Sequence, residues 1–251
     1  MTPPTIVSRD EWLAARLSLL EEEKRLIQMR DAVAETRQAL PWVRIDKDYR
    51  FEGPNGAVGL ADLFGGRSQL IVQHFMFGPG WREGCVGCSF LADHIDGTLV
   101  HLANRDVAYV AVARAPYAEI DRFRKRMGWR FPWVSSHDSD FNFDFQVSFT
   151  PDQIASGTVR YNFEQSDTSM EDLPGMSTFY RDGDGTVYHT NSVFGRGGEE
   201  FVLTDRLLDL TPLGRRLYDE NGMSVDWVRH HDRYDQPAGM PEIGVVLAGE
   251  R

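Results

Sequence analysis

The feature that most restricts the fold of this chain is a transition from a buried strand to a helix within residues 69–96. An apolar run begins at Leu70, is β-branched near its start and continues to Phe77, which predicts a buried strand. The Gly-Pro-Gly cluster at 78–80 then ends that strand. Beyond Cys88, apolar residues recur every three or four positions, at Leu91, Ile95, Leu99 and Leu102. This spacing predicts a helix that begins beside two cysteines.

Cys85 and Cys88 are separated by two residues and lie where the predicted helix begins. The first turn of a helix has unpaired N–H groups and the positive end of the helix dipole, so it stabilises a thiolate. Two intervening residues also allow the second sulfur to reach the first and close a disulfide. In this setting the spacing favours a redox-active pair. Two alternatives stay open: two buried, unreactive cysteines, or half of a metal site.

Cys85 comes first at the helix start and is therefore the candidate nucleophile. It would attack a disulfide and form a mixed disulfide that Cys88 resolves. Two neighbours have opposite effects, because the charge of Arg82 would favour the thiolate and the charge of Glu83 would oppose it. The sequence does not decide which of them lies closer to the sulfur.

The strand, a loop that contains Trp81 and the Cys-x-x-Cys pair at a helix start resemble the thioredoxin superfamily. Three longer segments, 59–97, 126–145 and 227–234, resemble a narrower group. This is an uncharacterised, mostly bacterial thioredoxin-like family, domain of unknown function 899, whose members are labelled predicted dithiol–disulfide oxidoreductases. The resemblance implies an α/β fold, thioredoxin-like with a peroxiredoxin-like elaboration, in which helices flank a central mixed sheet.

The resemblance also implies roles for two residues near the cysteines. Trp81 is similar to the tryptophan that directly precedes the first cysteine of thioredoxins, although three residues are inserted here, and it is a candidate substrate contact. The alternative is that Trp81 plugs the edge of the core. His74 falls where thioredoxins carry a buried acid, and as a catalytic residue it would accept the proton of the second cysteine. The alternative is a hydrogen-bonded core histidine.

Thioredoxin-like proteins place a cis-proline opposite the cysteines, and the matching place here falls near Met176 and Ser177. Pro174 comes two or three residues early, so either the loop bulges or the cis-proline is missing. If it is missing, Ser177 is expected to face the sulfurs and contact substrate. A peroxidase would carry a Pro and a Thr at fixed spacing ahead of its cysteine. Pro79 lies six residues before Cys85 with no Thr between them, which disfavours a peroxidase.

The other elements are predicted from periodicity and turn signals. A long helix over 8–40 is expected to begin at a capping box of Ser8 and Glu11 and to end at Pro41. Strands are expected at 49–52, 106–113, 133–136 and 141–149, and helices from Pro116 and over 199–208. A loop with one short extended piece at 159–163 is expected over 151–172, and a hairpin over 177–190. Alternating strands and helices predict a parallel core with helices on both faces.

Three regions are expected: an N-terminal helical arm at 1–41, a thioredoxin-like domain at 42–210, and a C-terminal extension at 211–251 packed on that domain. The arm is expected either to lie on its own domain or to pack on a second subunit, which would make the protein a homodimer.

The net charge and the distribution of apolar residues argue against two classes of partner, nucleic acids and membranes. Acidic side chains outnumber basic ones, 38 to 27, for a net charge of −11, which argues against nucleic-acid binding. No apolar run approaches the length of a membrane span, and the N-terminus does not have the pattern of a signal peptide, so a cytoplasmic protein is expected. In a reducing compartment a close cysteine pair is more often catalytic, sensing or metal-binding than structural.

No cofactor and no metal are expected. A zinc site would join Cys85 and Cys88 to two histidines, drawn from His94, His101, His230 and His231, but the spacings of zinc-binding motifs are missing. The leading hypothesis is a thiol–disulfide oxidoreductase that acts on a disulfide-containing protein or small molecule and is reduced by an unidentified thiol donor. The alternative is a non-enzymatic binding module on the same fold, with or without a metal on the cysteines.

Overall fold

The computed structural model describes residues 5–215 and 227–234. The chain forms two compact units, Met1–Pro41 and Trp42–Arg251. Most of the predicted C-terminal extension, 211–251, lies outside the described residues.

The first unit is the helix α1, Arg9–Gln38. Ser8 is its N-cap, and its side chain and that of Glu11 form the predicted capping box, in which the Glu11 carboxylate accepts the Ser8 N–H at 2.9 Å. None of the helix is buried, and ion pairs such as Arg16–Glu23, at 2.7 Å, lie along its surface. A role for this arm in a homodimer stays a prediction.

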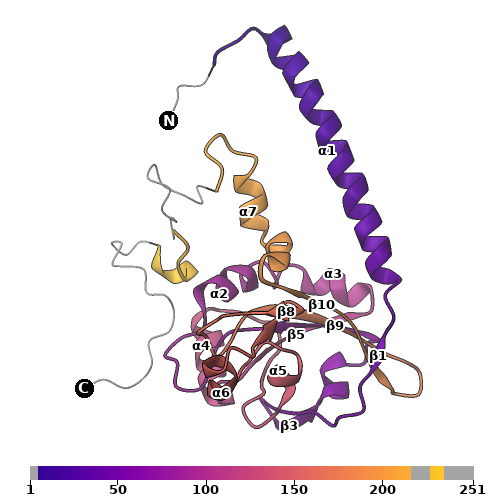
Figure 1. Cartoon of the computed structure of the whole chain (residues 1–251), viewed down its shortest axis with the longest axis vertical. Coiled ribbons are helices and arrows are strands. Elements are labelled where there is room, and N and C mark those ends of the chain that lie inside the picture. The colour runs from indigo at the N-terminus through magenta and orange to yellow at the C-terminus, as the bar shows by residue number, and fades with distance from the viewer. Residues whose placement is uncertain (1–4, 216–226, 235–251) are drawn as a thin grey trace. The chain divides into compact units, whose positions relative to one another are not determined.

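The second unit is built on an eight-stranded sheet with the order β1-β10-β9-β4-β5-β6-β2-β3 (Figure 1). Strands β4, β5 and β6 are parallel, and the other pairings are antiparallel. The strands are β1 Val43–Arg44, β2 Arg50–Gly53, β3 Gly56–Gly59, β4 Gln69–His74, β5 Val107–Ala113, β6 Trp133–Ser135, β9 Gly175–Arg181 and β10 Val187–Phe194.

Both faces of the sheet are covered, because alternate residues of β4 and β5 enter two separate cores. One core joins Leu70 and Val72 of β4 to the turn η1, Leu60–Phe64, and the short helix α5, Phe141–Asp144. The other core joins Tyr109 and Ala111 of β5 to helices on the opposite face. These helices are α2 Val86–Ala92, α3 Leu99–Asn104 and α4 Tyr117–Arg126.

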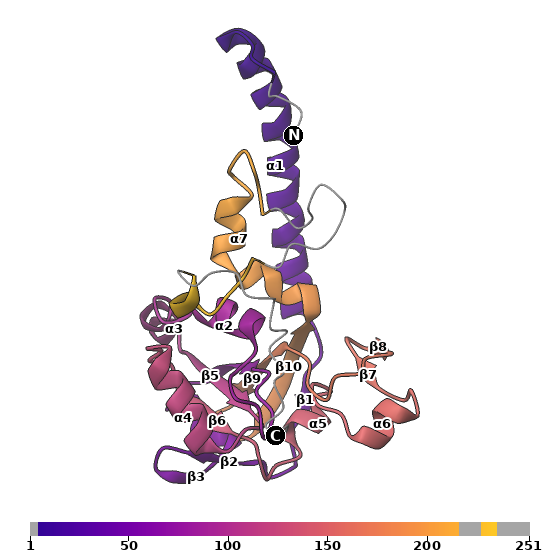
Figure 2. The same cartoon turned by 90° about the vertical axis from the view of Figure 1, so that its left-hand side faces the viewer.

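The chain runs through β4, α2, β5, α4, β9 and β10, and the central strands lie in the order β5-β4-β9-β10. A parallel pair followed by an antiparallel hairpin on the far side of the first strand is the thioredoxin-like arrangement. The predicted fold class, a central mixed sheet flanked by helices with a long N-terminal helix, is confirmed. Figure 2 shows α4 on one side of this sheet and the segment of α6, β7 and β8 on the other.

The strand predicted over 141–149 is wrong. Phe141–Asp144 forms α5, and the Phe145 N–H donates to the Phe141 carbonyl, so these two rings lie one helical turn apart in the same core. Gln146 then has a positive φ of 55°, which ends the turn. Aromatic residues at every second position include pairs four apart, so the pattern fits a helical turn as well as a strand.

Two predicted helices are interrupted. The helix after the cysteines ends at Ala92 and resumes as α3, because the Asp96 carboxylate leaves the helical register to accept the N–H groups of Arg130 and Phe131, at 2.9 and 3.0 Å. The helix predicted over 199–208 is split into the 3-10 helix η2, Gly195–Phe201, and α7, Leu203–Leu208, by the extended and buried Val202.

The loop predicted over 151–172 holds α6 Pro151–Ala155, β7 Arg160–Tyr161 and β8 Glu164–Gln165.

Candidate functional site

Backbone hydrogen bonds hold the cysteine pair at the start of α2, as predicted. The Cys85 N–H donates to the Met76 carbonyl at 2.9 Å, which ties the helix start to the segment that leaves β4. Cys85 is the N-cap residue of α2. The Ser89 hydroxyl donates to the Cys85 carbonyl at 2.8 Å, so a side chain of the helix itself stabilises its first turn.

The two cysteines are thiols in different surroundings. Cys85 is half-buried, whereas Cys88 is 5% exposed. A hydrogen bond with the Cys85 side chain and burial both raise the pKa of Cys88 well above its ordinary value, against a smaller opposing effect of the Met76 backbone. Cys88 therefore stays protonated at neutral pH, and Cys85 is the more accessible of the two sulfur-bearing residues.

Both sulfur-bearing residues line a pocket of about 180 Å³ between α2, the β9–β10 hairpin and η2. Its walls are mostly apolar and come from Leu91, Pro174, Met176, Val193, Phe194 and Val202. The segment that follows β10 covers one side of this pocket, since η2 packs on α2 and the Thr204 N–H of α7 donates to His94 Nε2 at 3.1 Å. Figure 1 shows α7 next to α2.

Gln73, not His74, lies against the cysteine helix. The Gln73 amide donates to the Cys88 carbonyl at 3.2 Å and accepts a hydrogen bond from the Tyr109 hydroxyl. The ring of His74 is on the other face of the sheet, where it stacks on Phe141 and Phe145 with centroids 5.6 and 5.8 Å away. The one-residue difference follows from the pleat, which sends neighbouring side chains to opposite faces.

Burial lowers the pKa of His74 to about 3, so its ring is neutral and a poor acceptor for a thiol proton. Its Nε2 lies 2.7 Å from the Ser177 hydroxyl, and its Nδ1 has no hydrogen-bond partner among the described residues. The geometry therefore fits the hydrogen-bonded core histidine better than a proton acceptor for Cys88. The catalytic role of His74 stays a prediction that these contacts do not favour.

Ser177 is also part of this core and does not face the sulfurs. It is 0% exposed, and its hydroxyl bonds to His74 and to the Ser192 hydroxyl, at 2.7 and 2.8 Å. Its neighbours Gly175 and Met176 line the pocket instead. No peptide bond in the described part of the chain is cis. The predicted substrate contact of Ser177 stays a prediction, and its burial and hydrogen bonds do not favour it.

Trp81 is half-buried and packs on the core that contains Phe75 and Cys88, and it is not part of the pocket wall. Its indole crosses the loop so closely that a Cβ on Gly78 would lie 2.9 Å from Trp81 Nε1. This position fits the interpretation of Trp81 as a plug at the core edge better than a substrate contact.

A buried ion pair near the cysteines was not predicted. Arg114 contacts Asp172 through two hydrogen bonds of 2.7 and 3.0 Å, and the Ser148 hydroxyl donates to the same carboxylate at 2.5 Å. The negative charge of Asp172 adds to the effects that raise the pKa of Cys88. No sequence pattern joins these residues, because Arg114 follows β5 and Asp172 precedes β9.

The described C-terminal residues pack beside the cysteine loop. Glu83 is paired with Arg126, at 2.5 Å, and with Arg233, so its charge is largely neutralised. His230 Nε2 lies 3.0 Å from the Gly84 carbonyl, and His231 Nδ1 lies 2.7 Å from Asp93. Residues 230–233 thus hold this segment in place through hydrogen bonds and ion pairs.

Three of the four histidines considered for zinc bond to other groups. His94 bonds to Thr204, and His230 and His231 bond to the Gly84 carbonyl and to Asp93. Within 5–215 and 227–234, no group of three or more His, Cys, Asp and Glu side chains is arranged to hold a metal ion.

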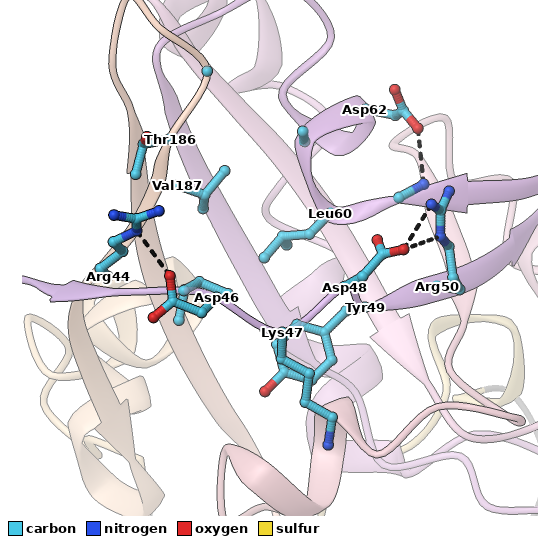
Figure 3. A pocket seen from close by; sticks show the side chains of 14 residues that line it. Arg44, Asp46, Lys47, Asp48, Tyr49, Arg50, Leu60, Asp62, Thr186 and Val187 are labelled. Carbon is cyan, nitrogen blue, oxygen red and sulfur yellow. Dashed lines mark hydrogen bonds and ion pairs between the residues drawn. The ribbon is translucent and has the colours of Figure 1, made fainter.

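A second pocket, of about 350 Å³, is rich in charges (Figure 3). Its cations are already matched by carboxylates: Arg44 with Asp46 and Arg50 with Asp48, at 2.8 and 2.7 Å. Lys47 bonds to two further carboxylates, those of Asp140 and Asp144. Neither Cys85 nor Cys88 lines this pocket, so it is not the candidate site.

In the described residues no helix is long and apolar enough to cross a membrane. A family model described as "Bacterial protein of unknown function (DUF899)" matches residues 1–234. The chain belongs to this family. The predicted family is thereby confirmed, and the match includes both cysteines and the segment at 227–234. No curated protein matches the sequence.

Solved structures that are similar to this DUF899 chain include a peroxidoxin and two peroxiredoxins. Peroxidoxin BcpB from Mycobacterium tuberculosis is 14% identical over 67% of this chain and 97% of its own, with a TM-score of 0.44. A cysteine-to-serine mutant of peroxiredoxin Q from Xanthomonas campestris is 12% identical over 67% and 98%, with a TM-score of 0.45. The reduced 2-Cys peroxiredoxin of Plasmodium vivax is 12% identical over 67% and 93%, with a TM-score of 0.39.

Proposed function

We propose that this protein is a thiol–disulfide oxidoreductase in which Cys85 attacks and Cys88 resolves. The observation that carries the proposal is the pair of hydrogen-bonded thiols in one pocket, one half-buried and one 5% exposed. A pair with one accessible and one buried sulfur suits two-step exchange. The accessible sulfur meets the substrate, and the buried sulfur is protected from other reagents.

The first step consumes one disulfide bond and forms another. The Cys85 thiolate attacks one sulfur of the substrate, a Cys85–substrate disulfide forms, and the other half leaves as a thiolate. That thiolate is released in the same pocket as Cys88, and it takes the Cys88 proton. This route is favoured because the Gln73 amide beside Cys88 is a poor base, and the His74 ring is neutral and lies on the other face of the sheet.

In the second step the Cys88 thiolate attacks Cys85. The mixed disulfide breaks, the second half of the substrate leaves as a thiolate that takes a proton from water, and a Cys85–Cys88 disulfide remains. The substrate has gained two electrons and the protein has lost two. A thiol donor returns the protein to its reduced form by the reverse exchange.

The test uses the reduced full-length protein and a panel of disulfides. The wild type is expected to lose two thiols per chain as the substrate is reduced. Cys85→Ser should abolish the reaction, whereas Cys88→Ser should accumulate a mixed disulfide at Cys85, visible by mass spectrometry. If the wild type reduces no disulfide, and if protein purified without chelator carries stoichiometric zinc that is lost on alkylation, the binding-module hypothesis replaces this one.

A further inference from the structure

We propose that the substrate is a small, apolar disulfide, of the dialkyl class, that enters the pocket above Cys85; this inference rests on the proposed function. Disulfides of this class differ from protein disulfides, and from large, charged disulfides such as glutathione disulfide. Three independent features of the pocket carry it: its size and walls, the occupied backbone at its edge, and its one charged residue among those described.

The size and walls suit a compact hydrocarbon chain. The pocket holds about 180 Å³, close to the ~150 Å³ of a cavity that accepts benzene. Apolar side chains from α2, β9, β10 and the start of α7 form most of its surface. Apolar burial therefore favours alkyl groups on both sides of a disulfide, whereas amides and carboxylates would lose hydrogen bonds to water without gaining others.

The backbone that a peptide would need is already occupied. Gly175 is paired with His74 on one side and with Phe194 on the other, so this strand offers no open edge beside the sulfurs. The Tyr161 hydroxyl donates to the Pro174 carbonyl at 2.6 Å and accepts the Gly195 N–H at 2.7 Å. Extended peptides bind by main-chain pairing to such groups, and here Tyr161 takes that place.

The covering segment limits what can reach the pocket. Gly198 of η2 lies against α2, where a Cβ would be 3.8 Å from Leu91 Cδ1. Glu199 is the one charged residue among the described residues of the wall, and it pairs with Arg196 and Arg215 at 2.9 and 3.4 Å. These two cations match the charge of Glu199, so the described wall offers no unpaired charge that would hold an ionic disulfide in the pocket.

The reaction balances without another component. One dialkyl disulfide accepts two electrons and two protons and leaves as two alkanethiols, while Cys85 and Cys88 become a disulfide. A dithiol such as dithiothreitol restores the thiols for the next turnover.

The experiment measures single-turnover oxidation of the reduced full-length protein by dipropyl disulfide, glutathione disulfide and insulin. Each rate is divided by the rate of the same disulfide with free dithiothreitol, which removes differences in intrinsic reactivity. The normalised rate with dipropyl disulfide is expected to exceed the other two by about tenfold or more, the factor that ~1.4 kcal/mol of differential binding supplies.

Three variants test whether the preference for dipropyl disulfide arises in the pocket. Val193→Phe fills the pocket from β10 and is expected to lower the dipropyl disulfide rate by about tenfold. Val100→Phe makes the same change at an exposed site on α3 and should leave the rate unchanged. Val193→Ala enlarges the pocket and should shift the preference toward longer dialkyl disulfides, which keeps the test informative if Val193→Phe fails to fold.

A non-reducible ligand separates this inference from the proposed function. Dipropyl sulfide should bind the wild type saturably and weaken the dipropyl disulfide reaction competitively. If glutathione disulfide or insulin reacts as fast as dipropyl disulfide after normalisation, the inference is overturned and the oxidoreductase stands. If dipropyl sulfide binds but no disulfide is reduced, the proposed function fails and the inference fails with it.

Discussion

The ring of His230 lies with its Nε2 atom 3.0 Å from the carbonyl oxygen of Gly84, the residue directly before Cys85. The ring is 3% exposed and stands edge-on to Phe123, with centroids 5.4 Å apart. Gly84 has no space for a side chain, since a Cβ there would lie 2.6 Å from the Phe75 ring and 2.8 Å from the Phe123 ring. The backbone before the candidate nucleophile is thus held by a residue far along the chain.

Replacement of His230 should loosen this backbone. His230→Ala leaves the Gly84 carbonyl without this donor and is expected to lower the free energy of unfolding by about 1–3 kcal/mol, measured by urea denaturation. His230→Gln restores a donor and should recover part of the loss. His231→Ala is the matched control, because His231 is 41% exposed and its pair with Asp93 is expected to be worth less than about 1 kcal/mol.

The same variants test whether His230 positions Cys85. At a temperature where all of them are folded, His230→Ala should change the pH profile of Cys85 alkylation and slow disulfide reduction, and His231→Ala should change neither. If alkylation of Cys85 is identical in the three variants and the wild type, His230 contributes to stability alone.

The buried ring of His74 should make stability depend on pH. Burial lowers its pKa to about 3, from an ordinary value near 6.5, so the unfolded chain binds a proton between these values that the folded chain does not. The stability that depends on the neutral His74 ring is fully present above pH 6.5. It is lost as the pH falls from 6.5 toward 3. At one pKa unit per ~1.4 kcal/mol, about 2 kcal/mol should be lost between pH 6.5 and pH 5.

His74→Gln is the comparison for this pH dependence. It removes the titrating group and keeps a side chain that can bond to Ser177, so its unfolding free energy should fall less steeply over the same range. Equal slopes for the variant and the wild type would mean that the ring binds its proton equally in the folded and the unfolded protein, so its pKa is not lowered by folding.

The pair of Arg114 and Asp172 should affect both stability and the second step of exchange. Asp172→Asn leaves the Arg114 charge, 13% exposed, without its main partner and should cost about 3 kcal/mol. Since the Asp172 charge raises the pKa of Cys88, the variant should also resolve the mixed disulfide faster, as measured by quenched-flow mass spectrometry.

Glu171→Gln provides the control for this pair. Glu171 also contacts Arg114, at 3.3 Å, but it is 56% exposed, so its removal should cost less than about 1 kcal/mol. A lifetime of the mixed disulfide that is longer in Asp172→Asn than in the wild type would contradict the assigned direction.

Several elements could be predicted from local patterns of residues. The strand before Cys85, the helix start at the cysteine pair, the capping box of α1 and the β9–β10 hairpin follow from short-range periodicity and turn residues. They were predictable because each is formed by residues close together in the chain.

The residues that surround the sulfurs could not be predicted in this way, because packing between distant parts of the chain selects them. Gln73 and His74 are both polar and both buried in a strand covered on two faces, so no alternation of polar and apolar residues reveals which of them turns toward Cys88. Phe141 and Phe145 fit either a strand or a helical turn until the core selects one. The contacts of His230 with Gly84 and of Arg114 with Asp172 join distant parts of the chain, and such pairings are set by packing, which leaves no local signal in the sequence.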